Sequence, residues 1–175
     1  RGLVGSEMCI RDRYSIVPPD RLRRILTRVF DEEEFLSPYG IRSLSKMYQK
    51  TPYSYQQGDD YATISYTPAD SPVGMFGGNS NWRGPVWMPI NYLLIEALQK
   101  FSHVLGDEFK MEFPTGSGRE LNLWQISLEL EQRLVGIFRR DASGRRAFNG
   151  DVELFQNDAT WSELFQFHES VSYTH

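Results

Sequence analysis

The run from Gly77 to Trp87 constrains the fold of this chain more than any other part of its sequence. It reads GGNSNWRGPVW, and the apolar residues that follow recur at helical spacing: Ile90, Leu93, Leu94, Ala97, Leu98 and Phe101. Such a pattern places an irregular, glycine-rich loop at the mouth of a helix. We expect that helix to run from Val86 to Leu105 and to end at Gly106, which suits the C′ position.

The composition of this loop suits a sugar ligand. Glycine lets the backbone approach a ligand closely, indole rings can stack on the apolar face of a pyranose, and guanidinium and amide groups can hydrogen-bond its hydroxyls. The alternative is that the two tryptophans are core aromatics and the arginine a structural ion-pair partner. We favour binding, because loops on rigid scaffolds commonly carry function. The predicted substrate contacts are Gly77, Gly78, Asn81, Trp82, Arg83, Gly84 and Trp87, with Arg42 and Tyr66 as weaker candidates that could instead anchor the loop.

Composition limits the other classes of function. The chain has 175 residues, of which 40% are hydrophobic and 14% aromatic, so it is long enough for one globular core. Its net charge of −4 argues against a nucleic-acid surface. The single cysteine, Cys9, excludes a disulfide framework or a cysteine metal site. No apolar run is long enough to span a bilayer, so we expect no membrane partner. We also expect no metal and no cofactor, and we favour a cytoplasmic location.

The remaining pattern predicts helices joined by long loops. A first helix should follow Pro18 and end near Phe30, a third should open at the capping-box spacing of Ser117 to Glu120, and a last one should be capped by Asp158. Residues 35–84 show little helical period and predict an irregular segment with short strands at most. We find no convincing strand pair, so the expected fold class is all-α with long loops.

Several of these stretches together resemble glycoside hydrolase family 63, the processing α-glucosidase group. The similarity rests on residues 77–98 and is supported by SPYGIRSLS at 37–45, PTGSG at 114–118 and the stretch 161–169. It extends over residues 14–169. The resemblance implies a partial (α/α)6 toroid, a carbohydrate substrate and no cofactor.

The resemblance also implies an inverting mechanism with two carboxyl groups. Inverting glycosidases hold a general acid and a general base roughly 6.5–9.5 Å apart, with room for a water molecule. The family's general base corresponds to Glu169, whereas its general acid, an aspartate, would lie outside this chain. The resemblance leaves three alternatives open: an α-glucosidase, a related hydrolase of glucosylglycerate, mannosylglycerate or trehalose, and a non-catalytic carbohydrate-binding helical domain.

Both ends of the chain look foreign to this family pattern. Residues 1–13 and 170–175 resemble translated sequencing-adapter read-through. We therefore expect residues 14–169 to be the C-terminal portion of a glycoside hydrolase catalytic domain, inactive as an isolated segment.

Overall fold

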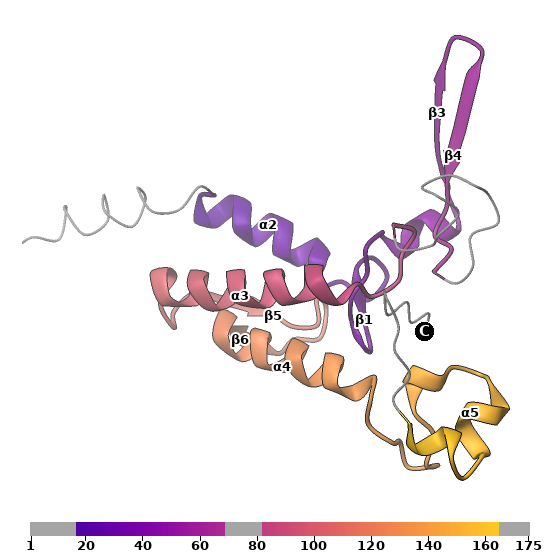
Figure 1. The fold of residues 1–175 in the computed structure, drawn as a ribbon. Coiled ribbons are helices and arrows are strands. Elements are labelled where there is room, and N and C mark those ends of the chain that lie inside the picture. Colours follow the sequence, from indigo (N-terminus) through magenta and orange to yellow (C-terminus); the bar gives the residue numbers. More distant parts are fainter. Residues whose placement is uncertain (1–16, 69–81, 165–175) are drawn as a thin grey trace, which may run out of the picture.

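A computed structural model describes residues 17–68 and 82–164 (Figure 1). Within these residues the chain forms four α-helices and three two-stranded antiparallel sheets. The helices are α2 (Pro19–Val29), α3 (Met88–Leu105), α4 (Leu123–Gly136) and α5 (Glu153–Asn157). The sheets pair β1 (Leu36–Ser37) with β2 (Gly40–Ile41), β3 (Tyr53–Gln57) with β4 (Asp60–Ile64), and β5 (Lys110–Glu112) with β6 (Glu120–Asn122). Short 3-10 turns lie at Lys46–Gln49, Ala147–Asn149 and Trp161–Glu163.

The expectation of an all-α fold forming part of an (α/α)6 toroid is wrong. The described residues combine helices with three small antiparallel sheets, each made by two strands that follow one another in the chain. The strands are two to five residues long. A period of two residues cannot be recognised reliably over such short runs, so loop and strand look alike in the sequence.

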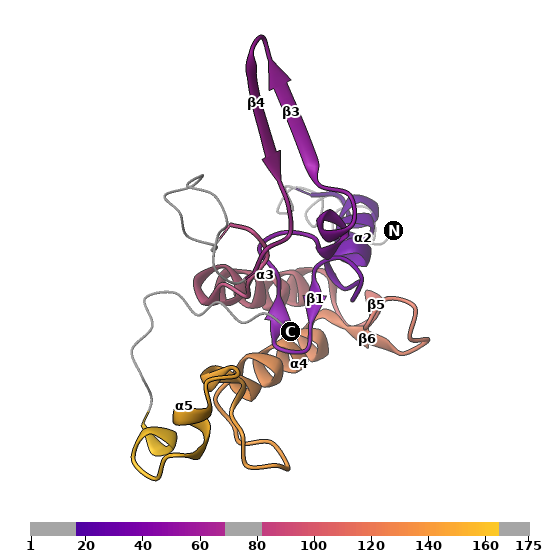
Figure 2. The ribbon, with the colours of Figure 1, turned by 90° about the vertical axis from the view of Figure 1, so that its right-hand side faces the viewer.

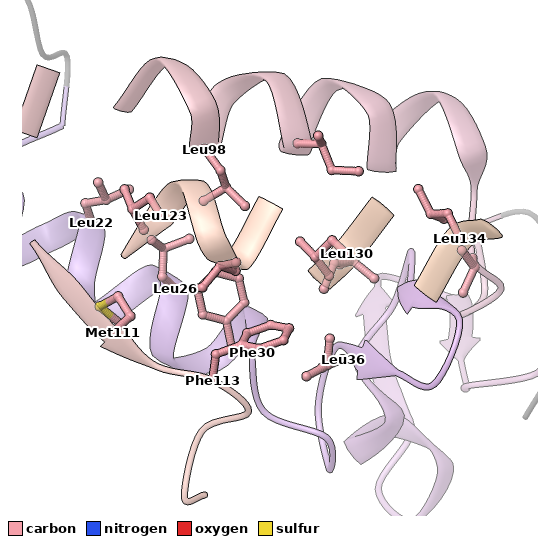
Figure 3. Close-up of a cluster of buried hydrophobic side chains, with 14 of the residues drawn as sticks. Leu22, Leu26, Phe30, Leu36, Leu98, Met111, Phe113, Leu123, Leu130 and Leu134 are labelled. Carbon is pink, nitrogen blue, oxygen red and sulfur yellow. The ribbon is translucent and has the colours of Figure 1, made fainter. Parts of the chain in front are cut away.

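The core lies between α2, α3, α4 and the β5–β6 sheet, and Figure 3 shows its side chains converging from these elements. The ring of Phe30 meets that of Phe113 edge to face, with centroids 5.1 Å apart. Both rings are fully buried. The same buried cluster contains leucines from each of the three helices: Leu22, Leu26, Leu98, Leu123, Leu130 and Leu134. Burial of this apolar surface is what holds the three helices together.

Helix α3 confirms the predicted helix after the glycine-rich loop. It begins at Met88, two residues after the predicted start, with Pro89 in its first turn where a missing N–H does no harm. It ends at Leu105, and Gly106, whose φ is 76°, follows as the C-cap residue. The buried face is rotated from the predicted one. Ile95 and Leu98 are buried, whereas Ile90 and Leu93 are 43% and 60% exposed.

Helix α4 begins later than the sequence pattern predicts. Residues of the expected first turn form strand β6 instead, and the helix opens at Leu123. Its capping box is made by Asn122 and Gln125: the Asn122 side chain accepts from the Gln125 N–H at 2.8 Å, and the Gln125 side chain accepts from the Asn122 N–H at 3.0 Å. The spacing at Ser117 and Glu120 is the same, so spacing alone could not choose between them.

The β3–β4 hairpin stands apart from the helices (Figures 1 and 2). Its strands pair in full register from Tyr53 opposite Ile64 to Gln57 opposite Asp60. The turn consists of Gly58 and Asp59, and glycine permits the positive φ of 61° that this two-residue connection uses. The smaller β1–β2 hairpin lies against α4, where Arg133 donates to the Ser37 carbonyl at 2.6 Å.

The segment after α4 folds by polar contacts rather than as the predicted last helix. Arg140 bridges to Glu163 at 2.6 Å, and the buried Gln156 side chain donates to the carbonyls of Arg146 and Gly150 at 2.9 and 2.7 Å. Asp158 does not cap a helix; its carboxylate accepts from the N–H groups of Thr160 and Trp161 at 2.8 and 2.9 Å, just before the 3-10 turn Trp161–Glu163. The remainder of the predicted helix lies outside the described residues.

Acid should destabilise this fold through three carboxylates whose pKa is lowered by hydrogen bonds. The strongest influence on Asp158 is the Trp161 N–H, which lowers its pKa by favouring the charged form. Because the folded pKa is the lower one, this contribution is complete above the unfolded carboxyl pKa of about 4 and is lost as pH falls through the folded value. The same sign applies to the other two groups. The three are Glu112, Asp141 and Asp158.

We expect the urea midpoint to be constant from neutral pH to about pH 5 and to fall below pH 4. In the variant Asp158→Asn the urea midpoint should fall less below pH 4, because one of the three carboxylates with a lowered pKa has been removed. A midpoint that stays constant to pH 3, or an identical fall in the variant, would contradict this assignment.

Candidate functional site

The candidate site is built around residues 82–87, which enter α3. Of the predicted contacts, Trp82, Arg83, Gly84 and Trp87 are described, together with Arg42 and Tyr66. Gly77, Gly78, Asn81 and the predicted general base Glu169 lie outside the described residues. The described residues therefore include one part of the predicted binding loop.

Trp82 and Trp87 form a pair at the mouth of α3. Their rings meet edge to face with centroids 4.5 Å apart and planes at 77°. Trp82 is 50% exposed, and Trp87, at the N-cap of α3, is half-buried. The interpretation of both as core aromatics therefore does not describe Trp82. An edge-to-face partner holds the exposed indole in one orientation while leaving ring surface open to solvent.

Gly84 is the point of closest packing in the loop. Its φ is +119°, and a Cβ built on it would lie 2.2 Å from Cε2 of Tyr66, so the Tyr66 ring lies directly on the glycine backbone. The Gly84 N–H donates to the Ser43 hydroxyl at 3.0 Å, and the preceding carbonyl of Arg83 accepts from the Thr67 N–H at 2.8 Å. Only glycine fits this conformation and this contact.

Arg83 is the largest fully buried side chain among the described residues, with 1% of its surface exposed. Its Nε and Nη2 have no hydrogen-bond partner there. Burying a cation whose donors are unpaired carries a desolvation penalty of roughly several kcal/mol. Buried polar groups without a partner are therefore rare in native structures. Two buried donors of Arg83 thus have no partner in the described part of the chain, which makes this side chain a candidate for holding a further group.

Arg42 serves as a buried anchor in this structure. One terminal nitrogen of its guanidinium donates to three backbone carbonyls that follow α2: those of Glu32 at 3.1 Å, Glu34 at 3.3 Å and Leu36. Arg42 is 6% exposed, and its backbone bridges to Val86. It thus ties the turn after α2 to the candidate loop.

Asn91 is a structural member of the site that the sequence analysis missed. Its Oδ1 accepts from the Ile41 N–H at 2.7 Å, and its Nδ2 donates to the carbonyls of Ile41 and Trp87 at 2.9 and 3.0 Å. The side chain is 1% exposed. An asparagine on the otherwise apolar buried face of a helix is the signal that could have revealed it, because buried amides need partners.

Within residues 17–68 and 82–164, no group of three or more His, Cys, Asp or Glu side chains is arranged to hold a metal ion. None of the helices in those ranges is both long and apolar enough to cross a bilayer.

Comparison with known proteins adds the evolutionary context. Residues 14–115 match the model of the glycosyl hydrolase family 63 C-terminal domain. An uncharacterised protein of Saccharomyces cerevisiae is 46% identical over 95% of this chain and 15% of its own length. A probable mannosyl-oligosaccharide glucosidase of Schizosaccharomyces pombe is 36% identical over 47% of this chain and 8% of its own length. The mannosyl-oligosaccharide glucosidase of Saccharomyces cerevisiae is 32% identical over 46% of this chain and 7% of its own length.

The chain spans at most 15% of these relatives, and no solved structure matches it. The family model nevertheless covers more than half of the chain and includes Trp82, Arg83, Gly84 and Trp87. The chain therefore belongs to glycosyl hydrolase family 63, in the C-terminal domain of that family.

Proposed function

We propose that this segment supplies one wall of the sugar-binding site of an inverting α-glucosidase. The observation that carries the proposal is the half-exposed indole of Trp82, held edge to face by Trp87 at the mouth of α3. Two relatives, a mannosyl-oligosaccharide glucosidase and a probable one, support a glucose-bearing oligosaccharide as the substrate, and we propose that the glucose is α-linked.

In this proposal each described side chain has a distinct task. Trp82 stacks on the pyranose ring, and the free donors of Arg83 bind a substrate oxygen. Gly84 lets the Tyr66 ring pack directly on the loop backbone, while Arg42 and Asn91 hold the loop in place. A loop fixed in this way keeps the sugar in one orientation, and such positioning lowers the entropic part of the reaction barrier.

The chemistry itself needs two carboxyl groups. We propose Glu169 as the general base that activates water, while the general acid, an aspartate, comes from outside residues 1–175. In an inverting reaction the acid protonates the leaving oxygen as the activated water attacks the opposite face of the sugar. No covalent intermediate forms, so the product has inverted anomeric configuration.

The complete protein tests this mechanism. Hydrolysis of an α-glucoside should release β-glucose first, which NMR detects before mutarotation, and Glu169→Gln should abolish turnover while leaving binding intact. The isolated chain should not hydrolyse the substrate. Activity in the isolated chain that depends on Glu169 would show that the acid has been misplaced.

The buried guanidinium favours one second candidate, a hydrolase of glucosylglycerate or mannosylglycerate. The unpaired Nε and Nη2 of Arg83 would match the two oxygens of a glycerate carboxylate. A panel of maltose, trehalose, glucosylglycerate and mannosylglycerate distinguishes the two functions. Preference for the charged substrates that is lost in Arg83→Gln would favour this second candidate.

Removal of the exposed indole should affect the substrate more than the fold. Trp82→Ala in the complete enzyme should raise KM or lower kcat by about tenfold, because a stacked ring contributes about 0.5–1.5 kcal/mol beyond its buried area. The free energy of unfolding should change by about 1 kcal/mol or less, since half of the ring is already in solvent.

Trp124 provides a matched control for this substitution. It is 49% exposed and lies at the start of α4, close to His103 and Gly106 at the far end of α3. That end is about 27 Å from the start of α3, by the helical rise. Trp124→Ala should leave the kinetics unchanged. Unfolding caused by Trp82→Ala would support the core interpretation instead.

A further inference from the structure

The β3–β4 hairpin makes contact with solvent along nearly all of its length. Every residue from Thr51 to Tyr61 is exposed, and the hairpin points away from the three packed helices (Figures 1 and 2). Strands of five residues extend about 17 Å. An isolated two-stranded hairpin is only marginally stable in water, so one that projects in this way calls for an explanation beyond packing in the described core.

One face of this hairpin carries two exposed tyrosine rings. Directly opposed residues of a strand pair share a face, and so do alternate residues of one strand. Tyr53 and Tyr55 therefore lie on the same face, and they are 51% and 50% exposed. The other members of the face are Gln57, Asp60, Ala62 and Ile64. It bears no basic side chain and a single carboxylate, which lies at the tip.

The chemistry of this face fits a neutral sugar chain and not an apolar packing surface. Apolar packing faces of strands are rich in branched aliphatic residues, whereas here only Ile64, at the base, is of that kind. Tyrosine offers a ring face for stacking and a hydroxyl for hydrogen bonding, and it loses little conformational entropy when it binds. The Tyr55 hydroxyl already donates to Gln57 at 3.0 Å, which steadies the ring.

The base of the hairpin is attached directly to the candidate sugar site. Strand β4 ends at Ile64, two residues before Tyr66, whose ring lies on Gly84. The next residue, Thr67, donates its N–H to the Arg83 carbonyl at 2.8 Å. The tyrosine face therefore has a fixed connection to the loop that carries Trp82.

We propose that the β3–β4 hairpin is an arm that contacts the oligosaccharide beyond the ring held at Trp82, with Tyr53 and Tyr55 stacking on its pyranose faces. This inference rests on the proposed function, and it adds that the enzyme favours extended, uncharged oligosaccharides. The arm acts on substrate affinity and not on the bond-breaking step.

The test uses the complete enzyme and two substrates, maltose and maltohexaose. The double variant Tyr53→Ala/Tyr55→Ala should raise KM for maltohexaose by about threefold to tenfold, as expected for the loss of ring contacts, and leave the kinetics on maltose unchanged. Tyr53→Phe/Tyr55→Phe keeps the rings and should retain most of the affinity. Tyr61→Ala removes a tyrosine from the opposite face and serves as the matched control.

Three results would overturn the proposal that the hairpin binds the oligosaccharide. In the alanine double variant, KM could change equally for both substrates or for neither, or Tyr61→Ala could raise KM for maltohexaose as much as the double variant does. Failure of the proposed function would look different, since the wild-type enzyme would then hydrolyse neither sugar. In that case calorimetric titration with maltohexaose decides the matter. Weaker binding in the alanine double variant supports the arm, and unchanged or absent binding rejects it.

Discussion

Replacement of Asn91 by alanine is expected to lower the free energy of unfolding by about 3 kcal/mol, because it leaves several buried backbone groups unpaired. The amide exchanges two hydrogen bonds with Ile41 of β2 and donates a third to the carbonyl of Trp87. Water cannot readily replace them, since the site is 1% exposed. Urea denaturation of the chain followed by circular dichroism measures the loss.

Two further variants separate hydrogen bonding from general damage to α3. Lys100→Ala, on the exposed side of the same helix, should change the stability by about 0.5 kcal/mol or less. Asn91→Asp keeps the volume but sets a carboxylate against two carbonyl oxygens, so it should destabilise at least as much as alanine. If Asn91→Ala lowered the free energy of unfolding by no more than Lys100→Ala, the three hydrogen bonds of Asn91 would contribute nothing to stability.

Gly84→Ala is expected to reduce kcat/KM of the complete enzyme by about 100-fold, the effect typical of a reacting group displaced by about 1 Å. The added Cβ would lie 2.2 Å from the Tyr66 ring, in a backbone conformation with φ of +119° that side chains rarely adopt. The ring or the loop must move, and Trp82 and Arg83 move with the loop.

Gly58→Ala is a matched control for backbone strain. Its φ is +61°, and no atom lies within 4 Å of the added Cβ, so it tests a positive φ without a clash. Its cost should be about 1–2 kcal/mol of stability, with activity on maltose preserved. Adding Tyr66→Ala to Gly84→Ala should restore part of the stability, because it removes the obstructing ring. Equal behaviour of the two glycine variants would show that the ring contact does not fix the loop.

The parts of this fold that the sequence predicts are those with a long period and clear ends. Helix α2 begins at Pro19 and ends at Val29 as expected, and α3 ends at Leu105 before Gly106. In both helices the apolar residues keep helical spacing over several turns, so the period is long enough to be recognised in the sequence. The predicted start of α4 was wrong because Ser117 and Asn122 both begin a capping-box spacing. Only the pairing of β6 with β5 excludes a helix that starts at Ser117.

The sheets and the roles of polar residues depend on information that the local pattern does not contain. Both faces of the β3–β4 hairpin meet solvent at residues 53–57, so the brief alternation of Tyr53, Ser54 and Tyr55 marks no buried face and is too short to identify a strand. Whether a buried arginine is an anchor or a free donor depends on distant partners. Arg42 finds three carbonyls, whereas two nitrogens of Arg83 find none among the described residues.

The end of α2 has a consequence for how this chain reaches its folded state. The carbonyl of Thr27 accepts from the Thr115 hydroxyl at 2.7 Å, across 88 positions of sequence, and the Phe30 carbonyl accepts from the Thr115 N–H at 3.0 Å. A helix finished by so distant a residue is completed only after a long loop has closed. Contacts between such distant residues slow the search for the native topology, and they couple the helix end to the Phe30–Phe113 contact.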